Sequence, residues 1–270
     1  MMNNIIMPKP YEILDVKPMT DIEYLFKLSY PNASDIKFGQ FMELSLPKVG
    51  ECPISITDFN SNEGWIEFLI RKVGIVTDEI FKLKAGDYIP LRGAYGKGFD
   101  QVDIKDKKVV IATGGSGLAP VRSLVNHIYN NPDKVKSMEL LCGFKDANSI
   151  LFKDDIEKWK TRHTVTLTVD QGCGLDGECV GLVTEYVPKL QMLNGSYDDL
   201  EVIIVGPPLM MKFTALSFAK MGVPDEKIWL SFERRMSCAV GKCGHCRIDE
   251  VYVCLDGPVF NYSFAKDLID

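Results

Sequence analysis

The stretch VVIATGGSGLAP, residues 109–120, decides the fold of the chain. Four small or β-branched apolar residues, typical of a buried strand, run directly into a turn that contains Gly114, Gly115 and Gly117. Glycines let the backbone come close to a ligand, and the helix expected to start near Pro120 presents unsatisfied N–H groups to a phosphate. The spacing departs from the regular G-x-G-x-x-G form, so a glycine-rich turn that serves only packing is the alternative. Its position between a strand and a helix favours a nucleotide site.

Outward from this turn, apolar runs alternate with helical stretches through the second half of the chain. Strand, helix, strand, helix at this spacing predicts a parallel sheet covered on both faces, with ligands at the carboxyl ends of its strands. The expected strands are 109–112, 139–142, 165–169, 201–205 and 228–231, and the expected helices are 120–131, 153–162, 182–190 and 208–221.

Two further turns follow expected strands of this half. VGPPLMM places Gly206 and Pro207 before a helix, although a methionine such as Met210 is usually a core residue. LCGFK places Gly143 where an adenosine ribose would approach and Lys145 where it could meet a phosphate. Both turns extend the expected nucleotide site.

The first half, to about residue 101, consists of short β-type segments separated by turn residues. In several of them apolar and polar residues alternate, which is typical of half-buried strands. The connections are mostly too short for crossover helices, so the pattern predicts a small antiparallel barrel. The expected strands are 11–16, 22–28, 41–46, 65–70 and 88–92, with one short helix near 77–83. The expected domains are 1–102, 103–232 and a C-terminal segment, 233–270.

Two motifs of the first half are candidates for ligand contacts. In ECPISIT, Pro53 fixes the backbone, and Ser55 follows where a strand should begin. In IRKVGIVTDEIFKL, the N–H groups of a helix start, the Thr77 hydroxyl and the charges of Arg71 and Lys72 could hold a pyrophosphate. An ordinary helix cap at Thr77 is the alternative, and on the motif alone it is the better interpretation.

Four of the eight cysteines lie in ERRMSCAVGKCGHCRIDEVYVCLDGPVF, residues 233–260, at Cys238, Cys243, Cys246 and Cys254. Gly241 and Gly244 let this loop turn tightly around a metal centre. The C-x4-C-x2-C spacing is that of plant-type [2Fe-2S] ferredoxins, in which the fourth cysteine lies much farther along the chain. A structural zinc site is the alternative, but such sites usually contain two C-x2-C pairs, and only one is present. The spacing therefore favours an iron–sulfur cluster, with His245 as a loop residue.

Cysteine usage, net charge and the length of apolar stretches limit the compartment and the classes of function that the sequence allows. Cys173 and Cys179 lie in a separate glycine-rich loop and are expected to be free thiols. Eight cysteines without a recognisable signal peptide predict a reducing compartment, and hence the cytoplasm. A net charge of -6 gives no basic surface for nucleic acid, and no apolar stretch is long enough for membrane insertion.

The order of barrel, nucleotide-type α/β domain and cysteine loop resembles the ferredoxin-NADP reductase superfamily. Within it, the chain is similar to the flavin and [2Fe-2S] electron-transfer subunits, such as the B subunits of anaerobic sulfite reductases. The resemblance covers essentially the whole chain, and its most specific portions are IRKVGIVTDEIFKLKAGD, LRGAYGKGF, IVGPPLMM and FERRMSCAVGKCGHCRIDEVYVCLDGPVFNY. The Arg-x-Tyr-Ser flavin motif of the family falls on residues 52–55. Serine is retained at Ser55, whereas Cys52 replaces the phosphate-binding arginine and Ile54 replaces the stacking aromatic residue.

This resemblance implies specific site residues. FAD would be contacted by Pro53, Ile54, Ser55, Ile56, Arg71, Val73, Gly74, Val76 and Thr77, with Ser55 orienting the flavin N5. The nicotinamide nucleotide would be contacted by Gly114, Gly115, Gly117, Pro120, Gly143, Gly206, Pro207 and Met210. A [2Fe-2S] cluster would be held by Cys238, Cys243, Cys246 and Cys254.

The implied activity is electron transfer from NADH, with NADPH as the alternative, through FAD at the domain interface and the cluster to a partner. The partners would be the iron–sulfur and siroheme subunits of a sulfite reductase complex, which reduce sulfite to sulfide. Electron-transfer subunits of dihydroorotate dehydrogenases, hydrogenases or bifurcating transhydrogenases have the same parts and are alternatives. A zinc-binding regulatory or scaffold subunit is an alternative of another class.

Overall fold

The computed structural model describes residues 6–170 and 179–268, so Cys173 lies outside the described residues. The chain divides into two compact units, Met1–Phe99 with Glu233–Pro258, and Asp100–Phe232 with Val259–Asp270. The C-terminal segment, expected as a separate part, is thus shared between the two units. Of the helices that the structure describes, none combines the length and hydropathy of a membrane span.

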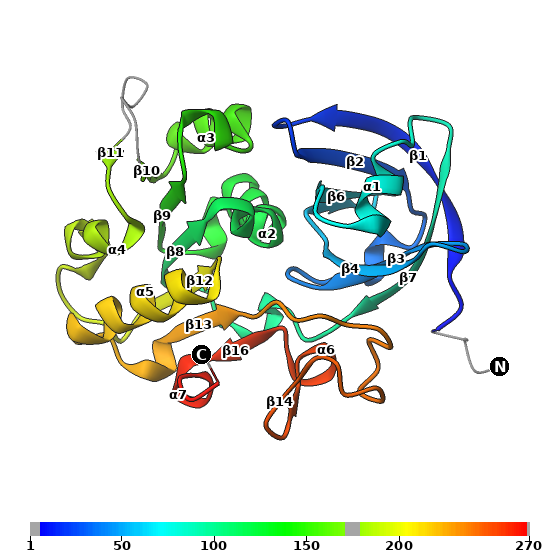
Figure 1. Ribbon diagram of the computed structural model, residues 1–270. Helices are drawn as coiled ribbons and strands as arrows, with labels where there is room; N and C mark the ends of the chain where they lie inside the picture. The colour runs from blue at the N-terminus through cyan, green and yellow to red at the C-terminus, as the bar shows by residue number, and fades with distance from the viewer. Residues whose placement is uncertain (1–5, 171–178, 269–270) are drawn as a thin grey trace. The chain divides into compact units, whose positions relative to one another are not determined.

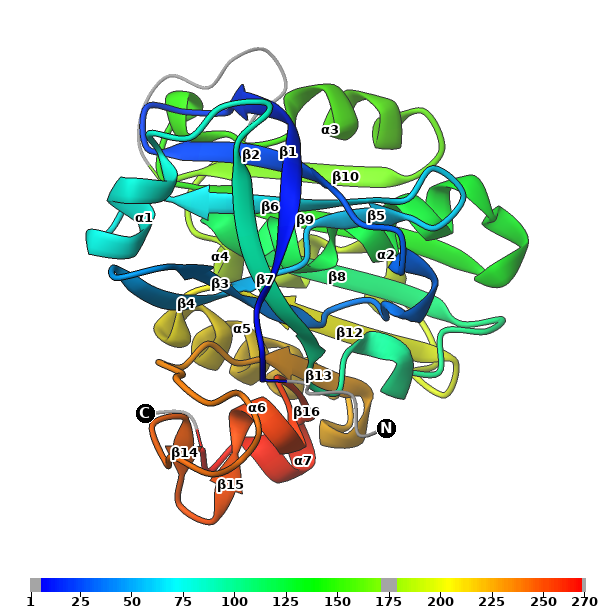
Figure 2. The same ribbon diagram turned by 90° about the vertical axis from the view of Figure 1, so that its right-hand side faces the viewer.

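The first unit contains a seven-stranded antiparallel sheet with the order β4-β3-β7-β1-β2-β6-β5 (Figures 1 and 2). Its strands are β1 Lys9–Pro18, β2 Glu23–Ser29, β3 Phe41–Leu46, β4 Gly50–Ser55, β5 Asp58–Asn60, β6 Trp65–Arg71 and β7 Tyr88–Tyr95. The two edge strands, β4 and β5, are consecutive in the chain. Between them, the N–H of Ile56 donates to Gln40 beside β3, and the N–H of Thr57 donates to Glu67 of β6, both at 2.9 Å. The chain therefore passes from one edge of the sheet to the other, which confirms the predicted antiparallel barrel.

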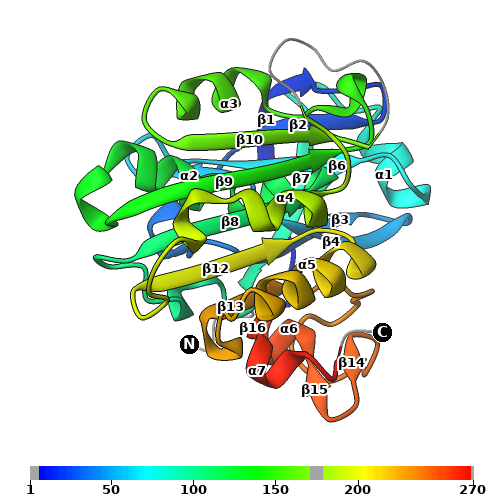
Figure 3. The same cartoon turned by 90° about the vertical axis from the view of Figure 1, so that its left-hand side faces the viewer.

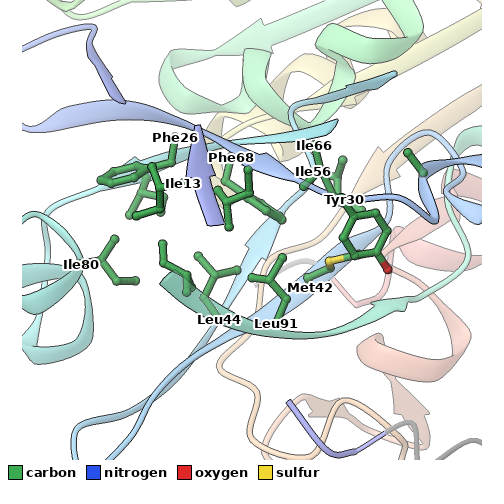
Figure 4. Packing of buried hydrophobic residues seen from close by; sticks show 14 of the residues in the cluster. Ile13, Phe26, Tyr30, Met42, Leu44, Ile56, Ile66, Phe68, Ile80 and Leu91 are labelled. Atoms are coloured by element: carbon green, nitrogen blue, oxygen red, sulfur yellow. The ribbon is translucent and has the colours of Figure 1, made fainter. Parts of the chain in front are cut away.

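The interior of the barrel is filled by side chains from alternate positions of its strands. Met42 and Leu44 of β3 point into this core, together with Phe26, Phe68 and Ile80 (Figure 4). Ile80 belongs to the short helix α1, Ile75–Ile80. Residues of β3 with the other parity, Glu43 and Ser45, face away from this core.

The second unit contains a seven-stranded sheet with the order β11-β10-β9-β8-β12-β13-β16, in which every pairing is parallel except that of β13 with β16. Helices α4 and α5 lie on one face of it, and α2 and α3 on the other (Figures 1 and 3). The strands are β8 Lys108–Gly114, β9 Ser137–Phe144, β10 Thr164–Val169, β11 Cys179–Val180, β12 Leu200–Val205, β13 Ile228–Ser231 and β16 Val259–Asn261. The helices are α2 Leu118–Asn130, α3 Lys153–Lys160, α4 Val183–Tyr186, α5 Pro208–Lys220 and α7 Tyr262–Ala265. The predicted parallel, doubly covered sheet is confirmed, with β16 as an antiparallel edge strand.

The cysteine loop leaves the second unit after β13 and returns to it at β16. These strands pair directly, with Ser231 opposite Val259. Between them the loop packs with the barrel unit, where the N–H of Lys97 donates to the carbonyl of Gly257 at 2.5 Å. The loop contains the small hairpin β14 Arg247–Ile248 and β15 Val251–Tyr252, followed by α6 Val253–Asp256.

Candidate cluster loop and nucleotide site

The hairpin of the loop brings two cysteines together. Cys246 precedes β14, and Cys254 follows β15 in the first turn of α6. Because β14 and β15 are antiparallel, the positions that flank them meet, and the N–H of Val253 donates to the carbonyl of Cys246 at 3.4 Å. Both side chains are buried. Two cysteines eight positions apart thus lie on one side of the hairpin base.

At the other end of the loop, backbone N–H groups surround the sulfur of Cys238. Cys238 Sγ accepts N–H groups from Val240, Lys242 and Cys243 at 3.3–3.4 Å. Cys254 Sγ accepts the N–H of Gly241 at 3.3 Å. Gly241 has φ +70°, a left-handed backbone conformation that favours glycine. Amide groups aimed at sulfur stabilise a thiolate, the form that binds metal.

Burial and the backbone N–H groups shift the pKa values of two of these thiols. Burial raises the pKa of Cys238, but the amide groups of Val240, Lys242 and Cys243, with the Cys243 side chain, outweigh it and lower the pKa to about 6. Burial raises the pKa of Cys254 to about 12, and its hydrogen bond with the Cys246 thiol acts in the same direction. Thiol–thiol hydrogen bonds therefore join Cys238 with Cys243 and Cys246 with Cys254, and the charge of Cys238 also acts on Cys254.

This donor set fits an iron–sulfur cluster. Among the described residues, no three His, Cys, Asp or Glu side chains are already gathered around one point as ligands of a single metal ion. Four cysteine thiolates on one loop are the ligand set by which proteins hold an iron–sulfur cluster. His245 is engaged elsewhere, since its Nδ1 lies 2.7 Å from the Ser237 hydroxyl.

The nucleotide turn of the second unit is built by glycines. A Cβ on Gly117 would lie 2.3 Å from the carbonyl oxygen of Val205, so the turn after β8 packs directly on the end of β12. A Cβ on Gly206 would lie 2.9 Å from the Met210 sulfur, and one on Gly143 would lie 2.2 Å from Val183 Cγ2. The turn after β8 can therefore pack on the end of β12, and the starts of α5 and α4 can pack against Gly206 and Gly143, because these positions lack side chains.

A cavity of about 710 Å³ opens over these strand ends, a volume usual for small-molecule sites. Of the residues expected at the nicotinamide nucleotide, Gly114, Gly115, Gly143, Pro207 and Met210 line it. Gly117, Pro120 and Gly206 do not line the cavity; the two glycines allow close packing in the turns, and Pro120 is a buried residue in the first turn of α2.

Several lining residues are absent from the sequence-based prediction. Leu209, Phe213 and Leu216 of α5 form an exposed apolar wall with helical spacing. Asp170 follows the end of β10, and burial raises the pKa of its carboxyl. The rule that ligands bind at the carboxyl ends of parallel strands would have identified Asp170.

The two candidate motifs of the barrel unit lie on the edge strand β4 and in the turn before α1. Pro53, Ile54 and Ser55 are half-buried on the edge strand β4, and Ile56 is buried. The buried Thr77 hydroxyl accepts the N–H groups of Val73 and Gly74 at 2.9 and 3.0 Å and donates to the Gly74 carbonyl. It therefore stabilises the turn at the start of α1.

The surroundings of that turn leave the rest of the motif accessible. Val73 and Ile75 are three-quarters exposed, and Gly74 has no neighbouring atom where a Cβ would point. The half-exposed Arg71 side chain lies 3.6 Å from a Glu23 carboxylate oxygen. Val76 packs against the barrel core.

Two family models match the chain. Residues 110–215 match the oxidoreductase NAD-binding domain. Residues 233–264 match the iron-sulfur cluster binding domain of dihydroorotate dehydrogenase B. The matches fall on the glycine-built sheet and on the cysteine loop.

Curated relatives match over most of their length. The sulfhydrogenase 1 subunit gamma of Pyrococcus furiosus is 32% identical, covering 96% of this chain and 94% of the relative. The probable dihydroorotate dehydrogenase B (NAD(+)) electron transfer subunit of the same organism is 35% identical, covering 86% of this chain and 81% of the relative.

Solved structures share the fold. An NADH-dependent reduced ferredoxin-NADP oxidoreductase superimposes with a TM-score of 0.79 at 24% identity, covering 94% of this chain and 88% of the other. A ferredoxin NADP+ reductase from Neisseria gonorrhoeae, with bound FAD and NADP, gives a TM-score of 0.71 at 19% identity, covering 83% and 98%. With its match to an NAD-binding domain and to an iron–sulfur binding loop, the chain belongs to the family of electron-transfer subunits that includes the sulfhydrogenase gamma and probable dihydroorotate dehydrogenase B subunits.

Proposed function

We propose that this chain takes hydride from NADH to FAD and passes single electrons through a [2Fe-2S] cluster to a partner subunit. The observation that carries the proposal is the presence, in one chain, of a glycine-lined nucleotide cavity and a loop of four cysteines paired two by two. When bound, a flavin accepts two electrons together and releases them one at a time, which links a hydride donor to a one-electron centre. No general acid or base is needed for such a transfer.

The carboxylate of Asp170 supports NADH over NADPH. It lines the nucleotide cavity at the end of a sheet strand, where an acidic side chain accepts hydrogen bonds from ribose hydroxyls. A 2'-phosphate at the same place would meet a like charge. Lys145 and Lys220 also line the cavity, but no arginine suited to a bidentate phosphate contact is among the lining residues.

The flavin site is proposed on β4 and the turn before α1. Pro53, Ile54 and Ser55 leave part of their surface exposed at the barrel edge, so a flat ring could lie against them. Ser55 would orient the flavin N5. The open turn at Gly74, where no side chain stands in the way, would lie against the pyrophosphate, and Thr77, which takes up the N–H groups of Val73 and Gly74, would hold that turn in shape without direct contact.

Sulfite is the proposed final acceptor, reduced on a siroheme-containing partner, and this rests on the resemblance of the cysteine loop and of IRKVGIVTDEIFKLKAGD to sulfite reductase subunits. A hydrogenase-type partner is the second candidate, because the sulfhydrogenase gamma subunit aligns with nearly the whole chain.

Anaerobic copurification tests the proposal. We expect the purified complex to show flavin and [2Fe-2S] absorption that NADH bleaches, together with NADH-dependent sulfite reduction. Hydrogen evolution or uptake by the same complex, without sulfite reduction, would support the hydrogenase candidate instead. A colourless protein that contains zinc would contradict both and support a regulatory or scaffold role.

A further inference from the structure

A buried arginine joins the barrel to the cluster loop. Arg92 lies on β7, and only 4% of its side chain is exposed. Its Nε and Nη2 donate to the Glu51 carboxylate at 2.5–3.1 Å. Its Nη1 donates to the carbonyl of Cys238 at 2.8 Å, and its Nη2 donates to the carbonyl of Ser237 at 2.6 Å. One guanidinium thus holds residues that are 41 and about 145 positions away in sequence.

These contacts fix the backbone at the first cluster cysteine. The Cys238 carbonyl belongs to the same residue whose sulfur accepts three amide groups. The planar fork of an arginine can serve a carboxylate and two carbonyls together, which a lysine ammonium cannot do with the same geometry. Glu51, the other partner, is the second residue of β4, which ends at Ser55. The same side chain therefore links the proposed flavin strand to the proposed cluster loop.

Two carboxyl groups, those of Glu43 and Glu51, lie close to the Arg92 guanidinium. Glu43 is fully buried, and within the described chain neither of its carboxylate oxygens has a hydrogen-bond partner. Its Oε1 lies 4.0 Å from Arg92 Nη2, and Glu43 stands opposite Arg92 in the pairing of β3 with β7. Two carboxyl groups and one guanidinium thus lie beside Cys238. Removing the guanidinium would leave the Glu51 carboxylate without its ion-pair partner and would favour the neutral form of Glu43 further.

We infer that Arg92 is a positioning residue for the cluster loop and that its positive charge raises the reduction potential of the cluster. The inference rests on the proposed [2Fe-2S] cluster. When the cluster accepts one electron, its charge becomes more negative by one unit, and a fixed buried cation nearby favours that state. Arg92 would therefore make the cluster a better acceptor for the electron that the flavin releases.

The test is an EPR-monitored redox titration of the holoprotein with three substitutions. Arg92→Gln removes the cation, so the midpoint potential should shift to a more negative value. Glu51→Gln removes an anion but keeps an acceptor for Arg92, so the potential should shift the opposite way, by less because Glu51 is partly exposed. Arg92→Lys keeps the charge and loses the fork, so its potential should stay closer to the parent while the cluster is lost faster on dilution.

Arg162→Gln is the matched control, since it removes an exposed arginine in the other unit. Shifts of the same sign in Arg92→Gln and Glu51→Gln would show a merely structural effect and overturn the inference. If Arg92→Gln fails to fold, a Glu51→Gln potential equal to that of the control overturns it as well. A parent protein without an EPR-active cluster would instead defeat the proposed function itself.

Discussion

The nucleotide site and the cluster loop are built in opposite ways. In the α/β unit, turns and helix starts pack closely on the strand ends because Gly117, Gly143 and Gly206 have no side chains, and the site is defined by backbone shape. In the cluster loop, specific side chains define the site, with thiols in two pairs and the buried Arg92 behind them. The first kind of site should be sensitive to added volume, and the second to lost ligands and altered charge.

The largest effect is expected where a ligand side chain is removed. Cys243→Ser should abolish electron transfer to the partner while NADH-driven flavin reduction continues, because the cluster lies after the flavin in the proposed path. Iron content, visible absorption and stopped-flow reduction measure the two steps separately. Cys179→Ser, outside the loop, is the control and should retain iron. Loss of flavin reduction in a folded, flavin-loaded Cys243→Ser protein would contradict the order of carriers.

Adding a side chain in the nucleotide turn should lower both the stability of the protein and its affinity for NADH. In Gly117→Ala the new Cβ would meet the Val205 carbonyl at 2.3 Å, and backbone cannot move aside as a flexible side chain does. We expect a loss of roughly 3 kcal/mol of stability and a large loss of NADH affinity, measured by urea unfolding and fluorescence titration. Gly115→Ala is the matched control, because its Cβ would meet nothing and only its φ of +54° costs energy, about 1 kcal/mol. Equal losses of stability in the two substitutions would contradict the packing role of Gly117; the comparison concerns stability alone, because Gly115 itself lines the nucleotide cavity.

Replacing Asp170 tests whether a side chain makes the nucleotide site, which is otherwise shaped by backbone, selective for NADH over NADPH. Asp170→Ser should raise the NADPH to NADH ratio of kcat/KM by about 10- to 100-fold, the worth of hydrogen bonds to a charged group. Steady-state kinetics with both cofactors measure this ratio. Ser217→Ala, in the same cavity, should change both cofactors alike. An unchanged ratio in Asp170→Ser would remove the support for NADH.

The smallest predicted effect concerns charge beside the cluster loop. Burial raises the pKa of Glu43 from 4.5 to about 7, with Arg92 opposing the shift and Glu51 and Cys238 adding to it. Between these values the unfolded chain is ionised while the folded protein retains the proton, so the Glu43 contribution to stability falls as pH rises. Above pH 7 that loss is complete.

Glu43→Gln cannot ionise and should gain stability relative to the parent between pH 4.5 and pH 8, on the order of 2 kcal/mol. Urea midpoints at both pH values measure the gain. Glu12→Gln, which changes an exposed carboxyl on β1, should follow the parent at both. A parallel response of Glu43→Gln and the parent would show that the buried carboxyl does not carry this pH dependence.

Sequence patterns predicted the regular elements well, and the misses have physical causes. The strands of the α/β unit lie where apolar runs predicted them, because strands buried on both faces need continuous apolar residues. β4 and β5 were missed, since Pro53 interrupts the pattern of a strand. In the structure β4 is an edge strand whose ladder runs only to β3, so the missing N–H of proline is tolerated there.

Candidate site residues could be proposed from the sequence where their chemistry and spacing are local. The four cysteines lie within one short stretch, so their spacing alone suggests them as ligands of one metal centre. Arg92 was not identified, because its partners Glu51 and Cys238 are far away in sequence and only the folded barrel brings them together. Asp170 was missed for a simpler reason, since a single acidic residue after a strand resembles any polar turn residue.

The direct pairing of Ser231 with Val259 has a consequence for how such a chain can be built. The cluster loop leaves and re-enters the second unit at adjacent points, so it is an insert at the tip of a β-hairpin. A short turn could join β13 to β16 in its place. A redox module of this kind can be gained, lost or transplanted by a single insertion or deletion, with the nucleotide sheet left intact.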